Sequence, residues 1–105
     1  MMTSSDIFQY NTSRLRNPTK TVLKPNVVNE ITIELPEITD NTVLKIQHHC
    51  TPWRIIHQYL YTNNRTIIVP VVCSKEIELA ENRVLATVVI MPIFAAFANI
   101  LQGKL

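Results

Sequence analysis

The chain has 105 residues, a formal net charge of +2 at pH 7 and one glycine, Gly103. This length is enough for one domain with its own core and too short for two. Loops that cradle phosphates and turns that bind dinucleotides need glycine where the backbone approaches the ligand or takes a positive φ. The composition therefore argues against nucleotide-dependent chemistry of those kinds.

The first 26 residues are basic and mostly polar. Only Asp6 opposes the four cations of this segment, which are Arg14, Arg16, Lys20 and Lys24. The segment also contains two prolines and shows no sustained hydrophobic period, which is typical of chain without regular structure. We therefore predict that residues 1–26 form an extended amino-terminal arm.

From residue 27 the pattern changes to the alternation of apolar and polar residues that is typical of half-buried strands. Ile31, Ile33 and Leu35 alternate with polar residues and predict a first strand. A polar loop follows, and the apolar face of a second predicted strand continues through Leu44, Ile46, His48 and Cys50.

Residues 53–61 and 66–73 predict a hairpin. Asn63 and Asn64 between them tolerate the left-handed geometry of a tight turn. The expected register pairs Tyr61 with Thr66, Tyr59 with Ile68, and His57 with Pro70.

Proline within a strand is typical of an edge or a bulge. Pro70 therefore places this hairpin at the border of its sheet. Both faces of the hairpin are nevertheless rich in apolar residues, and a strand that is apolar on both sides is buried on both sides.

Residues 74–83 fit a further short strand, because Ile77 and Leu79 alternate with glutamates. We expect this strand to form a hairpin with the carboxy-terminal segment through residues 81–83.

No charged residue lies between Arg83 and Lys104, so the carboxy-terminal segment must be buried. In the favoured interpretation, residues 84–91 form a strand rich in β-branched residues, which Pro92 ends because proline cannot donate a backbone hydrogen bond. A short helix then follows, with its apolar residues at spacings of three and four: Ile93, Phe94, Phe97, Ile100 and Leu101. The alternative is a bilayer span, since about 20 apolar residues cross the hydrocarbon.

These elements predict a mainly β fold, a small antiparallel β-sandwich or barrel of five to six strands. The expected organisation is an extended arm over residues 1–26, an antiparallel β domain over residues 27–91, and an apolar carboxy-terminal helix or tail over residues 92–105.

The soft metal ligands of the chain are three histidines and two cysteines: His48, His49, Cys50, His57 and Cys73. Compact zinc sites bring their ligands in close pairs, whereas the two cysteines are 23 positions apart. We therefore expect buried free thiols, no metal and no cofactor. A catalytic cysteine needs an accessible thiolate, so we also expect no catalytic residue and no enzymatic activity.

Two cysteines do not make a disulfide framework, and the amino terminus lacks the continuous apolar run of a secretory signal. We expect an intracellular protein, in the cytoplasm or within a particle, that is not secreted.

The amount of apolar surface relative to chain length favours a non-enzymatic structural subunit, which assembles into a homo-oligomer or a larger particle. The abundance of Asn, Thr and Ile is compatible with a viral or organellar origin of such a particle. The residues predicted to form its protein interfaces are Trp53, Ile55, Tyr59, Tyr61, Ile68, Ile93, Phe94, Phe97 and Leu101.

Two alternatives remain open. In one, the chain is a membrane-associated subunit with residues 84–102 in the bilayer. In the other, it is a nucleic-acid-binding module, in which aromatic residues stack on bases and the cations of the arm contact phosphates. Those cations are Arg14, Arg16, Lys20 and Lys24.

Overall fold

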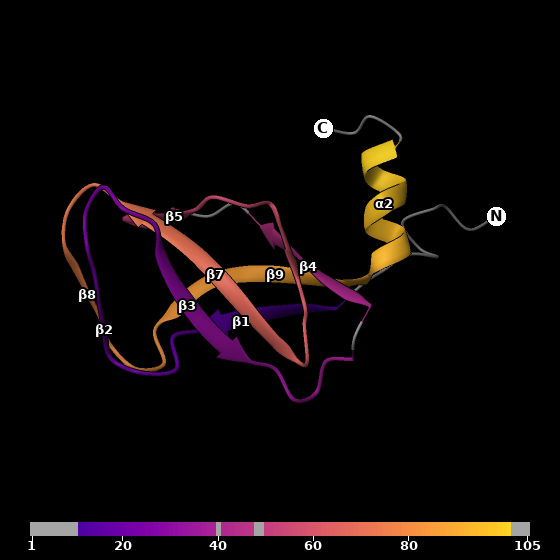
Figure 1. Cartoon of the computed structure of the whole chain (residues 1–105), viewed down its shortest axis with the longest axis horizontal. Helices are drawn as coiled ribbons and strands as arrows, with labels where there is room; N and C mark the ends of the chain where they lie inside the picture. The colour runs from indigo at the N-terminus through magenta and orange to yellow at the C-terminus, as the bar shows by residue number, and fades with distance from the viewer. Residues whose placement is uncertain (1–10, 40, 48–49, 102–105) are drawn as a thin grey trace.

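The computed structural model describes residues 11–39, 41–47 and 50–101. Within these residues the chain forms nine strands and then one helix (Figure 1). The elements are β1 (Thr12–Arg16), β2 (Thr21–Leu23), β3 (Asn29–Glu34), β4 (Thr42–Gln47), β5 (Trp53–Ile55), β6 (Tyr59–Tyr61), β7 (Thr66–Cys73), β8 (Ile77–Leu79), β9 (Val84–Pro92) and α2 (Ile93–Leu101).

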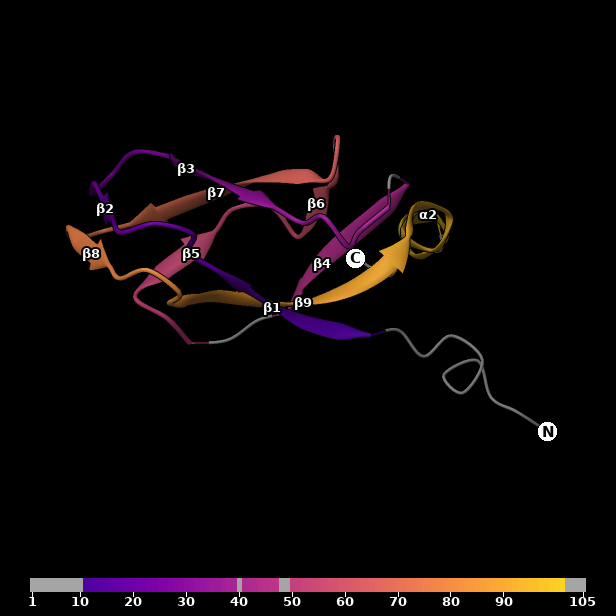
Figure 2. The same cartoon turned by 90° about the horizontal axis from the view of Figure 1, so that it is seen from below.

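The strands build three antiparallel sheets. Their orders are β1-β9-β4-β6, β3-β7-β5 and β2-β8. In Figure 2 the four-stranded and three-stranded sheets lie as two layers, with the small β2-β8 sheet at one end and α2 at the other. The mainly β fold is confirmed, with more strands than predicted. The sheets formed by the described residues stay open at their edges, so the barrel alternative is wrong.

The core lies between the layers. In the three-stranded sheet, Ile31 pairs with Val69 and Ile33 with Ile67, and all four side chains are buried. Strands β1, β4, β6 and β9 of the other layer contribute Leu15, Leu44, Leu60, Leu85 and Val88 to the same buried cluster. Burial of each such side chain contributes about 1.5–3 kcal/mol.

Strand β9 is one of the two inner strands of the four-stranded sheet, paired with β1 on one side and with β4 on the other. The strand extends to Pro92 and α2 begins at the next residue, which confirms the predicted strand, proline stop and helix. Within the described part of the chain, no helix is long and apolar enough to cross a membrane.

Residues 11–26 are not an extended arm, so this prediction is wrong for them. Strand β1 pairs with β9, and β2 pairs with β8. Both strands are short, and in each a single leucine, Leu15 or Leu23, is buried. Backbone pairing with a partner strand holds them, and it leaves no hydrophobic period in the sequence. Residues 1–10 of the predicted arm lie outside the described residues.

The predicted hairpin is wrong in its pairing. Of the two strands within residues 53–61, only β5 pairs with β7. Trp53 lies opposite Cys73, one residue away from the expected register. The chain then crosses to the other layer, where β6 pairs with β4 and Tyr61 lies opposite Val43. The aromatic residues of this segment therefore do not share one face, because Trp53 on β5 and the two tyrosines on β6 belong to different sheets.

Pro70 lies on β7, the central strand of its sheet, and not at the predicted border. Its carbonyl accepts a hydrogen bond from the backbone N of Ile56 (3.2 Å), at the position that follows the end of β5. The N and O of one residue face the same neighbour in an antiparallel ladder. The missing N–H of Pro70 therefore faces the end of β5 and leaves the pairing with β3 intact.

Two further expectations differ in detail. Strand β8 is present but pairs with β2, and not with β9. Strand β4 ends at Gln47, and Cys50 is exposed outside any strand, so its thiol is not buried as predicted. His48 lies outside the described residues.

Asn17 connects the segment between β1 and β2 to the segment between β8 and β9. Its side chain is fully buried, and its amide donates to the carbonyls of Leu79 (3.3 Å) and Ala80 (3.0 Å). Its backbone N donates to the carbonyl of Arg83 (2.9 Å), while its own carbonyl accepts from the N of Asn82 (2.8 Å). These four bonds fasten the β1–β2 connection to the β8–β9 turn.

We expect Asn17→Asp to lower the free energy of unfolding by about 3 kcal/mol or more at pH 7, because it places an unpaired carboxylate against two carbonyl oxygens. Burial raises the pKa of such a carboxyl group. A raised folded-state pKa makes the loss smaller at acidic pH and larger as the pH rises. Urea denaturation at several pH values measures this. The exposed control Asn11→Asp should change the value by less than about 0.5 kcal/mol, and equal effects at both positions would contradict the role of Asn17.

Candidate interaction surfaces

The first candidate surface is the exposed side of α2. Its buried side is Ala96, which packs with Val43 and Met91 on the outer face of the four-stranded sheet. Phe94 is 66% exposed and Phe97 is 52% exposed. The helix has no charged residue. Two phenylalanines three positions apart lie side by side on a helix, so α2 presents an uncharged aromatic surface to the outside.

The second candidate surface is the outer face of the three-stranded sheet. Ile68 on β7 is 53% exposed and lies opposite the exposed Thr32. A cleft of about 680 Å³ lies beside this pair of residues. Its apolar lining includes Val27, Val28, Ile56 and Val72, and its polar lining includes Arg54. Val27, Val28 and Ile56 are exposed. This surface is on the opposite layer from α2, so the two apolar surfaces are separate.

The predicted interface residues divide between the two surfaces, the outer face of the four-stranded sheet and the core. Phe94, Phe97 and Ile68 are exposed, as is Tyr61, whereas Tyr59 and Ile93 are half-buried. Trp53 and Ile55 face the core. The side chain of Leu101 lies outside the described residues.

The side chain of Trp53 is fixed in place by two contacts. Its indole Nε1 donates to the carbonyl of Leu85 (3.0 Å), and the guanidinium of Arg83 lies 5.2 Å from the centre of its ring. The carbonyl of Trp53 accepts a bond from the Thr51 hydroxyl. A buried tryptophan whose N–H has a partner is a structural anchor, which connects β5 to β9 across the two layers.

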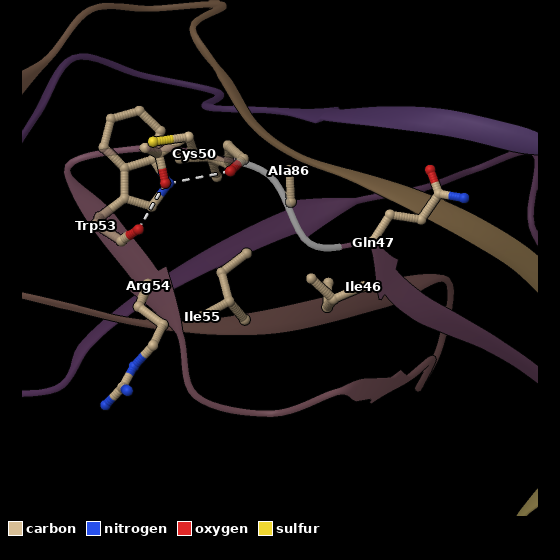
Figure 3. A pocket seen from close by; sticks show the side chains of 9 residues that line it. Ile46, Gln47, Cys50, Trp53, Arg54, Ile55 and Ala86 are labelled. Atoms are coloured by element: carbon tan, nitrogen blue, oxygen red, sulfur yellow. Dashed lines mark hydrogen bonds between the residues drawn. The ribbon is translucent and has the colours of Figure 1, made fainter. Parts of the chain in front are cut away.

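A smaller cleft of about 310 Å³ lies next to Trp53 (Figure 3). It is formed by the end of β4, by β5, and by Leu85 and Ala86 of β9, with Cys50 at its side. Arg54 is the charged residue of its lining. Its described lining thus offers a thiol and a guanidinium.

The described residues contain no group of three or more His, Cys, Asp or Glu side chains that is suited to hold a metal ion. Cys73 is buried, and its thiol donates to the carbonyl of Lys24 (3.5 Å). His57 is exposed. Of the soft ligands singled out in the sequence, His48 and His49 lie outside the described residues.

The four cations near the amino terminus belong to different elements. Arg14 and Arg16 are on β1, where Arg16 Nη1 donates to the carbonyl of Asn82 (2.9 Å). Lys20 precedes β2 and forms an ion pair with Glu78 of β8 (2.8 Å). Lys24 follows β2 and is exposed. They therefore do not lie together on one flexible arm.

Sequence reasoning missed Val27, Val28 and Ile56 as surface residues. A signal for one of them was present. Consecutive residues of a strand face opposite sides, so Ile55 and Ile56 cannot both point into one core. The same argument applies to Ile67 and Ile68, of which only Ile67 is buried.

Comparisons of the chain with protein-family models, with curated proteins and with solved structures found no match.

The hydrogen bond and the charge of Lys20 lower the pKa of Glu78 from its ordinary value of 4.5, and Glu78 in turn raises the pKa of Lys20. A lowered carboxyl pKa contributes stability that is present at neutral pH and is lost as the pH falls through that pKa. We expect Lys20→Gln to move the Glu78 titration midpoint upward toward 4.5, measured by NMR. Lys75→Gln is the control, and an unchanged Glu78 midpoint in Lys20→Gln would contradict the pairing.

Proposed function

We propose that the chain is a non-enzymatic structural subunit that assembles with further protein subunits, in the simplest case with copies of itself. The observation that carries this proposal is the exposure of Phe94 (66%) and Phe97 (52%) on an uncharged helix at one end of the molecule. Single exposed apolar residues are normal on a protein surface. Adjacent large aromatic residues are typical of an interface.

The helix alone is too small to form a stable interface. Specific interfaces bury about 1,200–2,000 Å² of total surface, more than one face of a nine-residue helix offers. The same chain offers a partly apolar surface for the helix: the exposed Ile68 on the outer face of the three-stranded sheet and the valines and Ile56 of the neighbouring cleft, which Arg54 also lines. We therefore propose that α2 of one copy docks against this face of the next copy.

Such a contact joins two different surfaces, so it is heterologous. Heterologous contacts generate closed rings when the rotation between copies closes, and larger assemblies when it does not. Both outcomes suit a structural subunit. Burial of the two phenylalanines would contribute about 1.5–3 kcal/mol for each side chain relative to full exposure.

Replacement of both exposed phenylalanines, Phe94→Ser with Phe97→Ser, should convert the oligomer into a monomer without unfolding it. The measurement is light scattering on a sizing column, with circular dichroism to confirm the fold. Ala98→Ser, at a neighbouring exposed position, is the matched control and should assemble normally. An unchanged mass after loss of both aromatic rings would contradict the role of α2.

A mixing experiment tests the heterologous geometry. A second variant carries Val28→Ser and Ile56→Ser in the cleft and should also be monomeric. When the two monomeric variants are mixed, one intact helix and one intact cleft remain, so a 1:1 heterodimer should form and grow no further. Failure of the mixture to associate, with both variants folded, would show that the two surfaces do not bind each other.

A further inference from the structure

The part of the four-stranded sheet that α2 leaves uncovered has a chemistry different from both apolar surfaces. Its residues follow from the register, since side chains directly opposite each other in an antiparallel pair share a face. Val43 and Met91 pack against α2 and mark the outer face. The rows on that face are Arg14–Thr87–Gln47, Thr12–Val89–Lys45–Tyr59 and Met91–Val43–Tyr61.

Two cations therefore lie on this outer face. Arg14 on the edge strand β1 is exposed, and Lys45 on β4 is half-buried. Across the sheet they are two strand spacings apart, about 10 Å, and along the strands they are offset by one row, about 7 Å. Neither forms an ion pair within the described residues, whereas Lys20 at the other end of the molecule does.

Two aromatic rings border the cations. Tyr59 lies directly opposite Lys45, and Tyr61 lies one row further along β6. Tyr61 is 52% exposed, and Tyr59 is half-buried against the cluster that holds α2. A tyrosine on the outer face of a sheet presents a ring on which a planar group can stack.

The described carboxylates lie outside the rows of this face, although Glu34 lines a cleft with Arg14 and Arg16 beside the edge of β1. Glu30 and Glu34 are on β3 of the opposite layer, and Glu37 is in the loop after it. The remaining glutamates are on β8 or in the segments beside it: Glu76, Glu78 and Glu81. Among the described residues, the outer face of the four-stranded sheet thus combines positive charge and aromatic rings with no negative charge.

We propose that this face binds single-stranded nucleic acid. Phosphates would contact Arg14 and Lys45, a base would stack on Tyr61, and Thr12, Gln47 and Thr87 would supply neutral hydrogen-bonding groups between them. A single strand fits better than a duplex, because the faces of its bases are free to stack on an aromatic ring. The surface is distinct from the α2 and cleft surfaces, so this binding does not depend on assembly.

The salt dependence of binding is set by the number of phosphate contacts. For single strands the slope of log K against log salt is about −0.7 per contact. Two contacts give a slope of about −1.4, which is a loss of about sevenfold in affinity between 50 and 200 mM salt. The probe is a fluorescein-labelled oligothymidylate of twelve nucleotides, measured by fluorescence anisotropy with the full chain.

Substitution of either cation, Arg14→Gln or Lys45→Gln, should weaken binding and reduce the slope by about 0.7. The control Lys24→Gln, an exposed cation beyond β2, should leave the slope unchanged. Tyr61→Ala should weaken binding at least about fivefold through the loss of stacking, while Tyr61→Phe should retain it. Circular dichroism confirms that each variant is folded.

Several outcomes would overturn the proposal. One is the absence of saturable binding at 50 mM salt. Others are unchanged binding when Arg14→Gln and Lys45→Gln are combined, and tighter binding of a duplex of the same length. Equal displacement of the oligonucleotide by polyglutamate would show attraction by charge alone and would also overturn it. None of these results bears on assembly, which the light-scattering measurements test separately.

Discussion

The inner position of β9 is the constraint on which the rest of the structure depends. A strand in the middle of a sheet must pair its backbone groups on both edges, because buried N–H and C=O groups without partners are costly. β9 meets this requirement with β1 on one side and β4 on the other. It carries much of the uncharged carboxy-terminal stretch, so its placement between two strands buries the segment that is least compatible with water. The pairing with β1 also fixes residues 12–16 in the body of the protein.

The direction in which the chain leaves β9 then determines which apolar side chains are exposed to solvent. Pro92 ends the strand, and α2 turns onto the outer face, where Ala96 meets Val43 and Met91. Helix α2 has apolar residues on more than one side, and its contact with the sheet covers only the side of Ala96. Phe94 and Phe97 are consequently left outside. The rest of the same face stays open and carries the cations and tyrosines.

The sequence predicts the elements whose side chains alternate or follow a helical spacing. Strands β3, β4 and β8 and helix α2 are of this kind. Strands β7 and β9 were predicted from runs of apolar, largely β-branched residues, and the proline stop at residue 92 from the backbone chemistry of proline. The face of Ile31 and Ile33 was also predicted correctly, because polar residues mark its opposite side.

The hydrophobic pattern of the sequence does not predict which strands pair with each other. Ile55 is followed by Ile56 and Ile67 by Ile68, so two registers that differ by one residue both bury isoleucines, and hydrophobicity does not choose between them. β2 and β8 are far apart in the sequence and pair because Asn17 and its neighbours bring their ends together. For the same reason Trp53 was predicted at an interface, whereas its contacts with Leu85 and Arg83 form only once the two layers have met.

The candidate surfaces were predicted in part. The exposed aromatic residues of α2 follow from a helix that is too apolar for one contact to cover. The cation and tyrosine face was not predicted as a unit, because Arg14, Lys45 and Tyr61 come together only through the order β1-β9-β4-β6. A one-residue change in any of these registers would separate them onto two faces.

The most direct test of assembly is sedimentation velocity of the unaltered protein over a hundredfold range of concentration in buffer without detergent. The account predicts that the sedimentation coefficient rises with concentration above that of the monomer, as copies associate through α2 and the cleft. A single species of monomer mass over the whole range would contradict self-association of the chain.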